Sequence, residues 1–75
     1  MVEEKIKTIL SDILNIDMKD ISDDFSMENC ESWDSFMHMT VIMSIEDEFS
    51  IKFDDDKLPE LNSLITLISS VQEKI

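Results

Sequence analysis

The stretch WDSFMHMTVIMSIEDEF, residues 33–49, marks the point where an acidic, turn-rich segment gives way to a clean helical pattern. The Asp34 carboxylate can accept a hydrogen bond from the free amides of a first helical turn, so we predict Asp34 as the N-cap and Ser35 as the first helical residue. Ser35 is then expected to point outward, beside unpaired N–H groups. Those amides and the positive end of the helix dipole favour an anion by roughly 0.3–1 kcal/mol, so a phosphoryl group esterified to Ser35 would lie in a favourable field.

The helix predicted over residues 35–49 carries apolar side chains on two sides. Helical geometry places a core face on one side, formed by His38, Val41, Ile42, Ile45 and Phe49. The opposite side holds Phe36, Met39, Met43 and Asp47. A domain of this size has few elements with which to cover that second side. Two interpretations stay open: the preceding loop folds across it, or it is a docking surface beside Ser35, for which flexible methionine side chains are well suited.

Helical spacing predicts two further long helices on either side of this one. Near the N-terminus, one apolar stripe is formed by Ile6, Ile9, Leu10, Ile13 and Leu14. Near the C-terminus, Asn62 or Ser63 can cap a last helix, whose expected buried stripe is Leu64, Leu67, Ile68, Val71 and Ile75. These stripes can pack against the core face of residues 35–49.

The segments between these helices are predicted to be irregular. Residues 15–33 lack periodicity and form a long loop, with Ile16, Ile21, Phe25 and Trp33 as candidates to pin it to the core. Pro59 restricts the backbone before it, so a third helix there is only a turn or two. The predicted fold is all-α: a small antiparallel bundle of three main helices plus a short third helix or turn, in a single domain, residues 1–75.

Composition narrows the classes of partner. Asp and Glu number 18 against 6 Lys and Arg, which gives a net charge of −12. This charge repels nucleic-acid phosphates and anionic lipid headgroups, and it favours basic protein surfaces, unless it serves solubility alone. No apolar stretch approaches the roughly 20 residues needed to cross a bilayer. Because a signal-peptide pattern is missing and Cys30 is the lone cysteine, we expect a cytoplasmic protein and assign Cys30 no role. We also expect a monomer.

The order of these features resembles the acyl carrier protein family. The resemblance is carried by Asp34-Ser35-Phe36, an apolar helix, and then Glu46-Asp47-Glu48-Phe49. In that family the serine of an Asp-Ser-apolar motif is esterified by 4'-phosphopantetheine, whose thiol holds acyl or aminoacyl groups as thioesters. The resemblance implies that Ser35 carries this group, that Asp34 is helix cap and motif residue, and that the chain is a carrier with no catalytic or metal-binding residues. Many members have glycine just before the motif, where this chain has Ser32-Trp33 and no glycine anywhere.

The resemblance also implies where partner enzymes dock. Acids on this helix meet arginine and lysine of the partners in the family, and the matching positions here are Asp34, Glu46 and Asp47. Where fatty-acid carriers commonly have acids one turn after the serine, this chain has Met37 and Thr40, which favours a specialised route such as polyketide, nonribosomal peptide or cell-surface glycan modification. The expected docking residues are Phe36, Met37, Met39, Thr40, Met43, Glu46 and Asp47.

The implied partners are three kinds of enzyme. They are a phosphopantetheinyl transferase, an acyl- or aminoacyl-loading ligase or transferase, and a downstream synthase or transferase with a basic docking surface. Two alternatives to an acyl carrier stay open: an aminoacyl carrier of the D-alanyl type, and an acidic helical adaptor that uses Asp34-Ser35 only as a helix cap. The modification state of Ser35 separates the adaptor from the carriers.

Hydrolytic and calcium-binding interpretations are less favoured. His38 follows Ser35 by one helical turn, and a histidine can activate a hydroxyl. His38 falls towards the core face, however, and no glycine-rich elbow accompanies it, so we expect a half-buried, hydrogen-bonded side chain under the loop. The segments Asp23-Asp24 and Asp54-Asp55-Asp56 lack the alternating ligands and the glycine of a calcium loop.

Overall fold

The computed structural model describes residues 2–75, which form three α-helices and three short 3₁₀ helices. The α-helices are α1 (Val2–Leu14), α2 (Ser35–Phe49) and α3 (Leu64–Lys74). The 3₁₀ helices are η1 (Met18–Asp20), η2 (Met27–Asn29) and η3 (Asp55–Glu60). The predicted all-α class is confirmed, and η3 is the short helix expected near Pro59. The pattern did not predict η1 and η2, which are single turns within the long loop.

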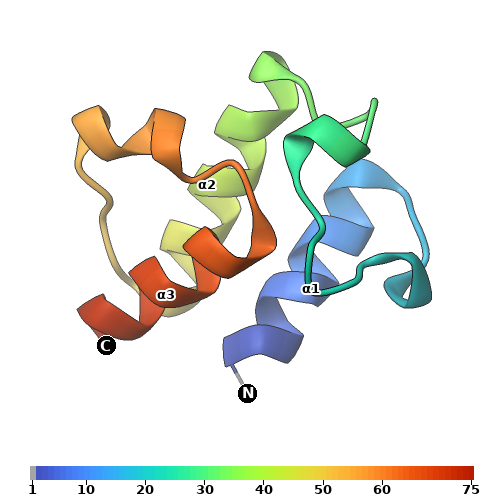
Figure 1. Ribbon diagram of the computed structural model, residues 1–75. Coiled ribbons are helices and arrows are strands. Elements are labelled where there is room, and N and C mark those ends of the chain that lie inside the picture. Colours follow the sequence, from blue (N-terminus) through green and yellow to red (C-terminus); the bar gives the residue numbers. More distant parts are fainter. Residues whose placement is uncertain (1) are drawn as a thin grey trace.

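The core forms where the three α-helices meet. α1 packs against both α2 and α3, and Figure 1 shows α1 and α2 running in opposite directions with α3 crossing at an angle. The predicted core face of α2 is confirmed, with Phe49 half-buried at its end. The buried hydrophobic residues are Ile6, Leu10, Leu14, Ile21, Phe25, Trp33, Val41, Ile42, Ile45, Phe53, Leu61, Leu64, Leu67 and Val71.

The loop between α1 and α2 is anchored by the apolar side chains that the sequence singled out. Ile21, Phe25 and Trp33 are at most 5% exposed, and Ile16 is half-buried. The rings of Phe25 and Trp33 stack with their centroids 5.7 Å apart. The Phe25 carbonyl accepts a hydrogen bond from the Leu64 N–H at 2.9 Å, which ties the loop to the start of α3. The segment that precedes α2 is thereby held against the core.

The helices α1 and α2 end without glycine. Asn15 follows α1 with φ 56°, and Ser50 follows α2 with φ 54°, so both residues adopt the left-handed conformation. Glycine is the residue most often found in this conformation after a helix. Asparagine tolerates this conformation well, whereas for most other residues it costs about 1–2 kcal/mol. The Ser50 N–H donates to the Glu46 carbonyl, which satisfies one of the last carbonyls of α2.

α3 begins with a capping box. Ser63 Oγ accepts a hydrogen bond from the Thr66 N–H at 3.3 Å, and Thr66 Oγ1 accepts one from the Ser63 N–H at 3.2 Å. Of the two predicted caps, Ser63 is therefore the one used. The expectation that Ile75 joins the buried stripe is wrong: its side chain is 65% exposed, because α3 ends at Lys74 and the core ends one turn earlier, at Val71.

Candidate functional site

Asp34 caps α2 as predicted. Its backbone is extended, with φ −101° and ψ −174°, and its Oδ1 accepts a hydrogen bond from the Met37 N–H at 2.9 Å. Its carbonyl accepts the first helical hydrogen bond, from the His38 N–H at 2.8 Å. Ser35 is the first residue of α2 and is exposed. The cap therefore presents the Ser35 hydroxyl at the surface, at the N-terminus of a four-turn helix.

The start of α2 fits a phosphate ester on Ser35. The Asp34 carboxylate accepts a hydrogen bond from the Met37 N–H. The N–H groups of Ser35 and Phe36 have no carbonyl acceptor within the helix. The first turn of α2 holds no acidic side chain, whereas the first turn of α1 holds Glu3 and Glu4. A negative group on Ser35 would lie at the positive end of the helix dipole, a position worth about 0.3–1 kcal/mol to an anion.

The turn before Ser35 does not require glycine. Within residues 2–75, positive φ angles occur at Asn15 and Ser50 only, so Ser32 and Trp33 keep conformations that any residue can adopt. Trp33 instead fixes this turn by burial, since its side chain is 1% exposed. The departure from the family pattern is thus compatible with the cap that Asp34 forms.

His38 lies under the loop and is hydrogen-bonded at both ring nitrogens. Its Nδ1 accepts from the Trp33 Nε1–H at 3.1 Å, and its Nε2 lies 2.9 Å from the Leu58 carbonyl oxygen, to which it donates. The side chain is 8% exposed, so the expectation of a hydrogen-bonded histidine beneath the loop is confirmed and its burial is greater than predicted. Because both nitrogens are engaged on the core side of α2, His38 is not placed to take a proton from the exposed Ser35 hydroxyl.

The second side of α2 is open to solvent. Phe36 is 78% exposed, Met39 48% and Met43 63%, so the interpretation that the loop folds across them is wrong. We refer to Phe36, Met39 and Met43 as the apolar face of α2. Thr40 is also exposed, whereas Met37 is half-buried and packs against the core.

The acids expected to meet partners differ in their surroundings. Asp47 is exposed, and Asp34 is engaged as the helix cap. Glu46 is half-buried, and its Oε2 accepts a hydrogen bond from the Phe53 N–H at 2.8 Å. Through this hydrogen bond, Glu46 holds the segment after α2 against the helix. This role was not predicted from the sequence.

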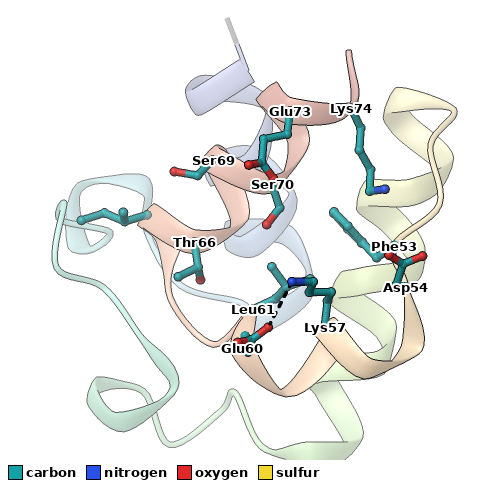
Figure 2. A pocket seen from close by; sticks show the side chains of 11 residues that line it. Phe53, Asp54, Lys57, Glu60, Leu61, Thr66, Ser69, Ser70, Glu73 and Lys74 are labelled. Carbon is teal, nitrogen blue, oxygen red and sulfur yellow. Dashed lines mark ion pairs between the residues drawn. The ribbon is translucent and has the colours of Figure 1, made fainter.

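A pocket of about 290 Å³ lies between η3 and α3, away from the predicted site. Figure 2 shows side chains of η3 on one side of the pocket and side chains of α3 on the other, with the ion pair between Lys57 and Glu60 of η3, whose Nζ and Oε2 atoms are 4.0 Å apart. No residue of α2 lines this pocket in the described part of the chain. This pocket was not predicted from the sequence, although Ile65, an apolar residue off the buried stripe of α3, was an available signal.

None of the helices within residues 2–75 combines the length and apolar character needed to span a membrane. In the same residues, no three or more His, Cys, Asp and Glu side chains come together as a group that could hold a metal ion.

Comparison with known proteins points to one family. Residues 4–71 match the family model described as "Phosphopantetheine attachment site". An acyl carrier protein of Buchnera aphidicola subsp. Schizaphis graminum is 38% identical over 73 residues, which cover 97% of this chain and 92% of that protein. An acyl carrier protein of Guillardia theta is 28% identical over 72 residues, covering 96% and 89%. An acyl carrier protein homolog of Mycoplasma genitalium is 37% identical over 59 residues, covering 79% and 67%.

A small helical domain with a phosphopantetheine attachment site is a carrier protein and not an enzyme. This chain belongs to the acyl carrier protein family. Its prosthetic group is phosphopantetheine, and its partners include a phosphopantetheinyl transferase and enzymes that handle acyl groups. The family resemblance, the cofactor and the carrier function expected from the sequence are confirmed.

Proposed function

We propose that Ser35 is the residue that carries the phosphopantetheine arm and that Asp34 holds it in position. The observation that carries this proposal is an exposed Ser35 at the start of a helix whose first turn has free amides and no acidic side chain. When bound, the arm supplies a thiol on which acyl groups are held as thioesters. The protein supplies the exposed hydroxyl, the free amides and the helix dipole that favour the phosphate.

We further propose that partner enzymes dock on the apolar face of α2 and on the exposed side chains around it. Phe36 directly follows Ser35, so an enzyme that reaches the Ser35 hydroxyl comes within reach of this ring. Asp47 lies three turns further along α2 and offers a charge to a basic partner surface. Thr40 is exposed between them, while Met37 and Glu46 contribute less because both are partly engaged by the protein itself.

The makeup of this surface supports a dedicated carrier in a specialised pathway, as opposed to fatty-acid synthesis. Met37 and Thr40 stand where fatty-acid carriers commonly have acids, and the apolar face lies beside them. We propose that a loading ligase or transferase and a downstream synthase or transferase of that pathway recognise apolar area in addition to charge. The cytoplasmic setting and the monomeric state expected from the sequence stay predictions.

Intact-mass spectrometry tests the attachment residue. Incubation with coenzyme A and a broad-specificity phosphopantetheinyl transferase should add one phosphopantetheine mass, and Ser35→Ala should remove the addition. Ser32→Ala is the matched control, because Ser32 is also exposed, three residues earlier, and should leave the addition intact. Modification of the Ser35→Ala variant, or none of the natural chain with several transferases, contradicts the proposal.

Transferase kinetics test the docking surface. Met43→Gln should raise KM, because it removes apolar contact area while leaving Ser35 and its cap unchanged. Ile75→Gln provides the matched control, since Ile75 is 65% exposed and Met43 is 63% exposed, but Ile75 lies beyond α3. Equal KM values for the two variants would show that the apolar face takes no part in docking.

A further inference from the structure

Two neighbouring segments and one that is distant in sequence meet at the buried His38 ring. Trp33 belongs to the turn before α2, His38 to the first turns of α2, and Leu58 to η3. The Trp33 Nε1–H donates to His38 Nδ1 at 3.1 Å, and His38 Nε2 contacts the Leu58 carbonyl oxygen at 2.9 Å. We refer to this hydrogen-bonded chain as the Trp33–His38 clamp.

We propose that His38 is a positioning residue for the modification of Ser35. Through Nδ1 it holds the Trp33 indole, and through Nε2 it ties that indole to η3. The turn that carries Asp34 and Ser35 is thereby fixed against the core. The inference rests on the proposed role of Ser35, because the clamp sets the position of Ser35 for the attachment of the phosphopantetheine arm.

The chemistry of the two rings allows one arrangement of protons. An indole nitrogen is a donor only, so His38 Nδ1 must be the acceptor in its contact with Trp33. The proton of the neutral imidazole then resides on Nε2, where the Leu58 carbonyl accepts it. Residues 2–75 contain no buried side-chain nitrogen or oxygen that lacks a partner, so this single tautomer satisfies every polar atom of the clamp.

The clamp acts on Ser35 through the short backbone between them. Trp33 is the last buried residue before α2, and both Asp34 and Ser35 are exposed and have no burial of their own. The path of the chain into the cap is therefore set by Trp33 on one side and by α2 on the other. Stacking on Phe25 restrains the plane of the indole, with 19° between the rings, and the bond to His38 restrains its rotation within that plane.

A purely apolar pair would fill the same volume without these directional bonds. Burial of polar groups is favourable only when each is hydrogen-bonded, and apolar residues of similar size often serve packing as well. A directional contact does what packing alone does not: it selects one rotamer of Trp33. This difference predicts that variants with the same volume but different hydrogen bonds differ in modification rate while remaining folded.

Two histidine variants separate the positioning role from general stability. In His38→Asn the amide oxygen lies near the position of Nδ1 and can still accept from Trp33, whereas in His38→Gln the amide reaches towards Leu58 and the acceptor for Trp33 is lost. We expect His38→Gln to lower the kcat of phosphopantetheine attachment by about tenfold or more with little change in KM, since small misplacements of a reacting group have effects of that size. His38→Asn should restore most of this kcat.

Trp33→Phe gives a second way to remove the same bond. It keeps an aromatic ring on Phe25 and removes the indole N–H, so its kcat should fall as that of His38→Gln does. In the double variant Trp33→Phe, His38→Gln, the two losses should not add, because either change breaks the one bond that matters. Val71→Ala is the matched control: Val71 is 0% exposed on α3, and its loss lowers stability without touching the clamp. All variants are assayed at a temperature where each is folded.

Nuclear magnetic resonance provides a readout that does not depend on the transferase. The chain contains 1 Trp and 1 His, so the indole N–H and the imidazole nitrogens each give a unique signal. We expect the Nε2–H tautomer in the natural chain, and in His38→Gln faster exchange of the indole N–H together with shifted amide signals for Asp34 to Phe36. Unchanged amide signals in His38→Gln, an Nδ1–H tautomer, or a normal kcat for folded His38→Gln would each overturn the inference. Failure of the Ser35→Ala test would overturn the attachment proposal instead, and the spectra would still decide whether the clamp positions the turn.

Discussion

Both sides of α2 carry apolar side chains, but their surroundings are opposite. On the core face, Val41, Ile42 and Ile45 are at most 2% exposed, whereas Phe36, Met39 and Met43 are at least 48% exposed. The core face uses β-branched side chains, which are stiff and suit one fixed packing arrangement. The apolar face uses an aromatic ring and flexible methionines, which suit contact with several partners in turn. The type of apolar residue therefore differs between the buried side of this helix and the exposed side that we propose for docking.

The largest expected difference between the two sides is in stability. Ile45→Ala should lower the free energy of unfolding by about 2–5 kcal/mol, because it empties a fully buried site. Met43→Ala should change it by less than about 0.5 kcal/mol, because Met43 is 63% exposed. Urea unfolding followed by circular dichroism measures both. Similar losses for the two variants would mean that the apolar face is covered in solution.

A second prediction compares the caps of α2 and α3. Asp34→Ala and Ser63→Ala should each lower the free energy of unfolding by about 0.5–2 kcal/mol, because each removes an acceptor from a first-turn amide. Only Asp34→Ala should also slow phosphopantetheine attachment, since only this cap lies beside Ser35. Unfolding curves paired with mass-spectrometric time courses distinguish the two effects. A fully stable Asp34→Ala variant would show that the carboxylate does not hold the helix start.

The neighbouring acids Glu46 and Asp47 give a third comparison. Glu46→Ala should lower the free energy of unfolding by about 0.5–1.5 kcal/mol, because the Phe53 N–H loses its acceptor. Asp47→Ala should leave stability unchanged and should slow association with the transferase, an effect that added salt reduces. Stopped-flow kinetics against ionic strength test the second part. A flat salt dependence in the natural chain would indicate that its negative charge serves solubility alone.

The smallest expected effect concerns partner choice at Met37 and Thr40. Exposed ion pairs contribute about 0.2–1 kcal/mol each, so each acid of the double change Met37→Asp, Thr40→Glu should raise the loading rate by a malonyl transferase of fatty-acid synthesis by about 1.4- to fivefold. Because Met37 is half-buried, Thr40→Glu alone is the control without a packing change. Steady-state rates provide the measurement. If the natural chain is loaded as fast as a fatty-acid carrier, these positions do not set the pathway.

Much of the fold and the start of the site could be predicted because the signals are local. The stripe of α1, the cap at Asp34 and the stop near Pro59 depend on residues within one or two helical turns of each other. The prediction for Ile75 was wrong because the helical spacing of apolar residues continues past the end of α3, whereas the neighbouring elements that would cover this side chain do not extend so far. The turns η1 and η2 were missed because short 3₁₀ helices leave no apolar period in the sequence.

The contacts that were not predicted join different elements of the fold. The bond from Phe53 to Glu46 spans 7 residues and the contact of His38 with Leu58 spans 20. Each contact depends on how η3 and its flanking segments pack against α2, and no local sequence pattern predicts that packing. The pocket between η3 and α3 has the same origin, since its walls come from two elements whose separation is set by packing.

The sequence by itself determined the helical class, the cap at Asp34, the exposed Ser35 and the family to which the chain belongs, because cap chemistry, helical period and motif are properties of neighbouring residues. Only the tertiary structure decided which apolar side of α2 is covered, that Glu46 is engaged by the protein's own backbone, and that Trp33 and His38 hold each other beneath the loop. Burial and the hydrogen bonds between elements arise when whole elements pack, so they follow from the assembled core and not from the local sequence.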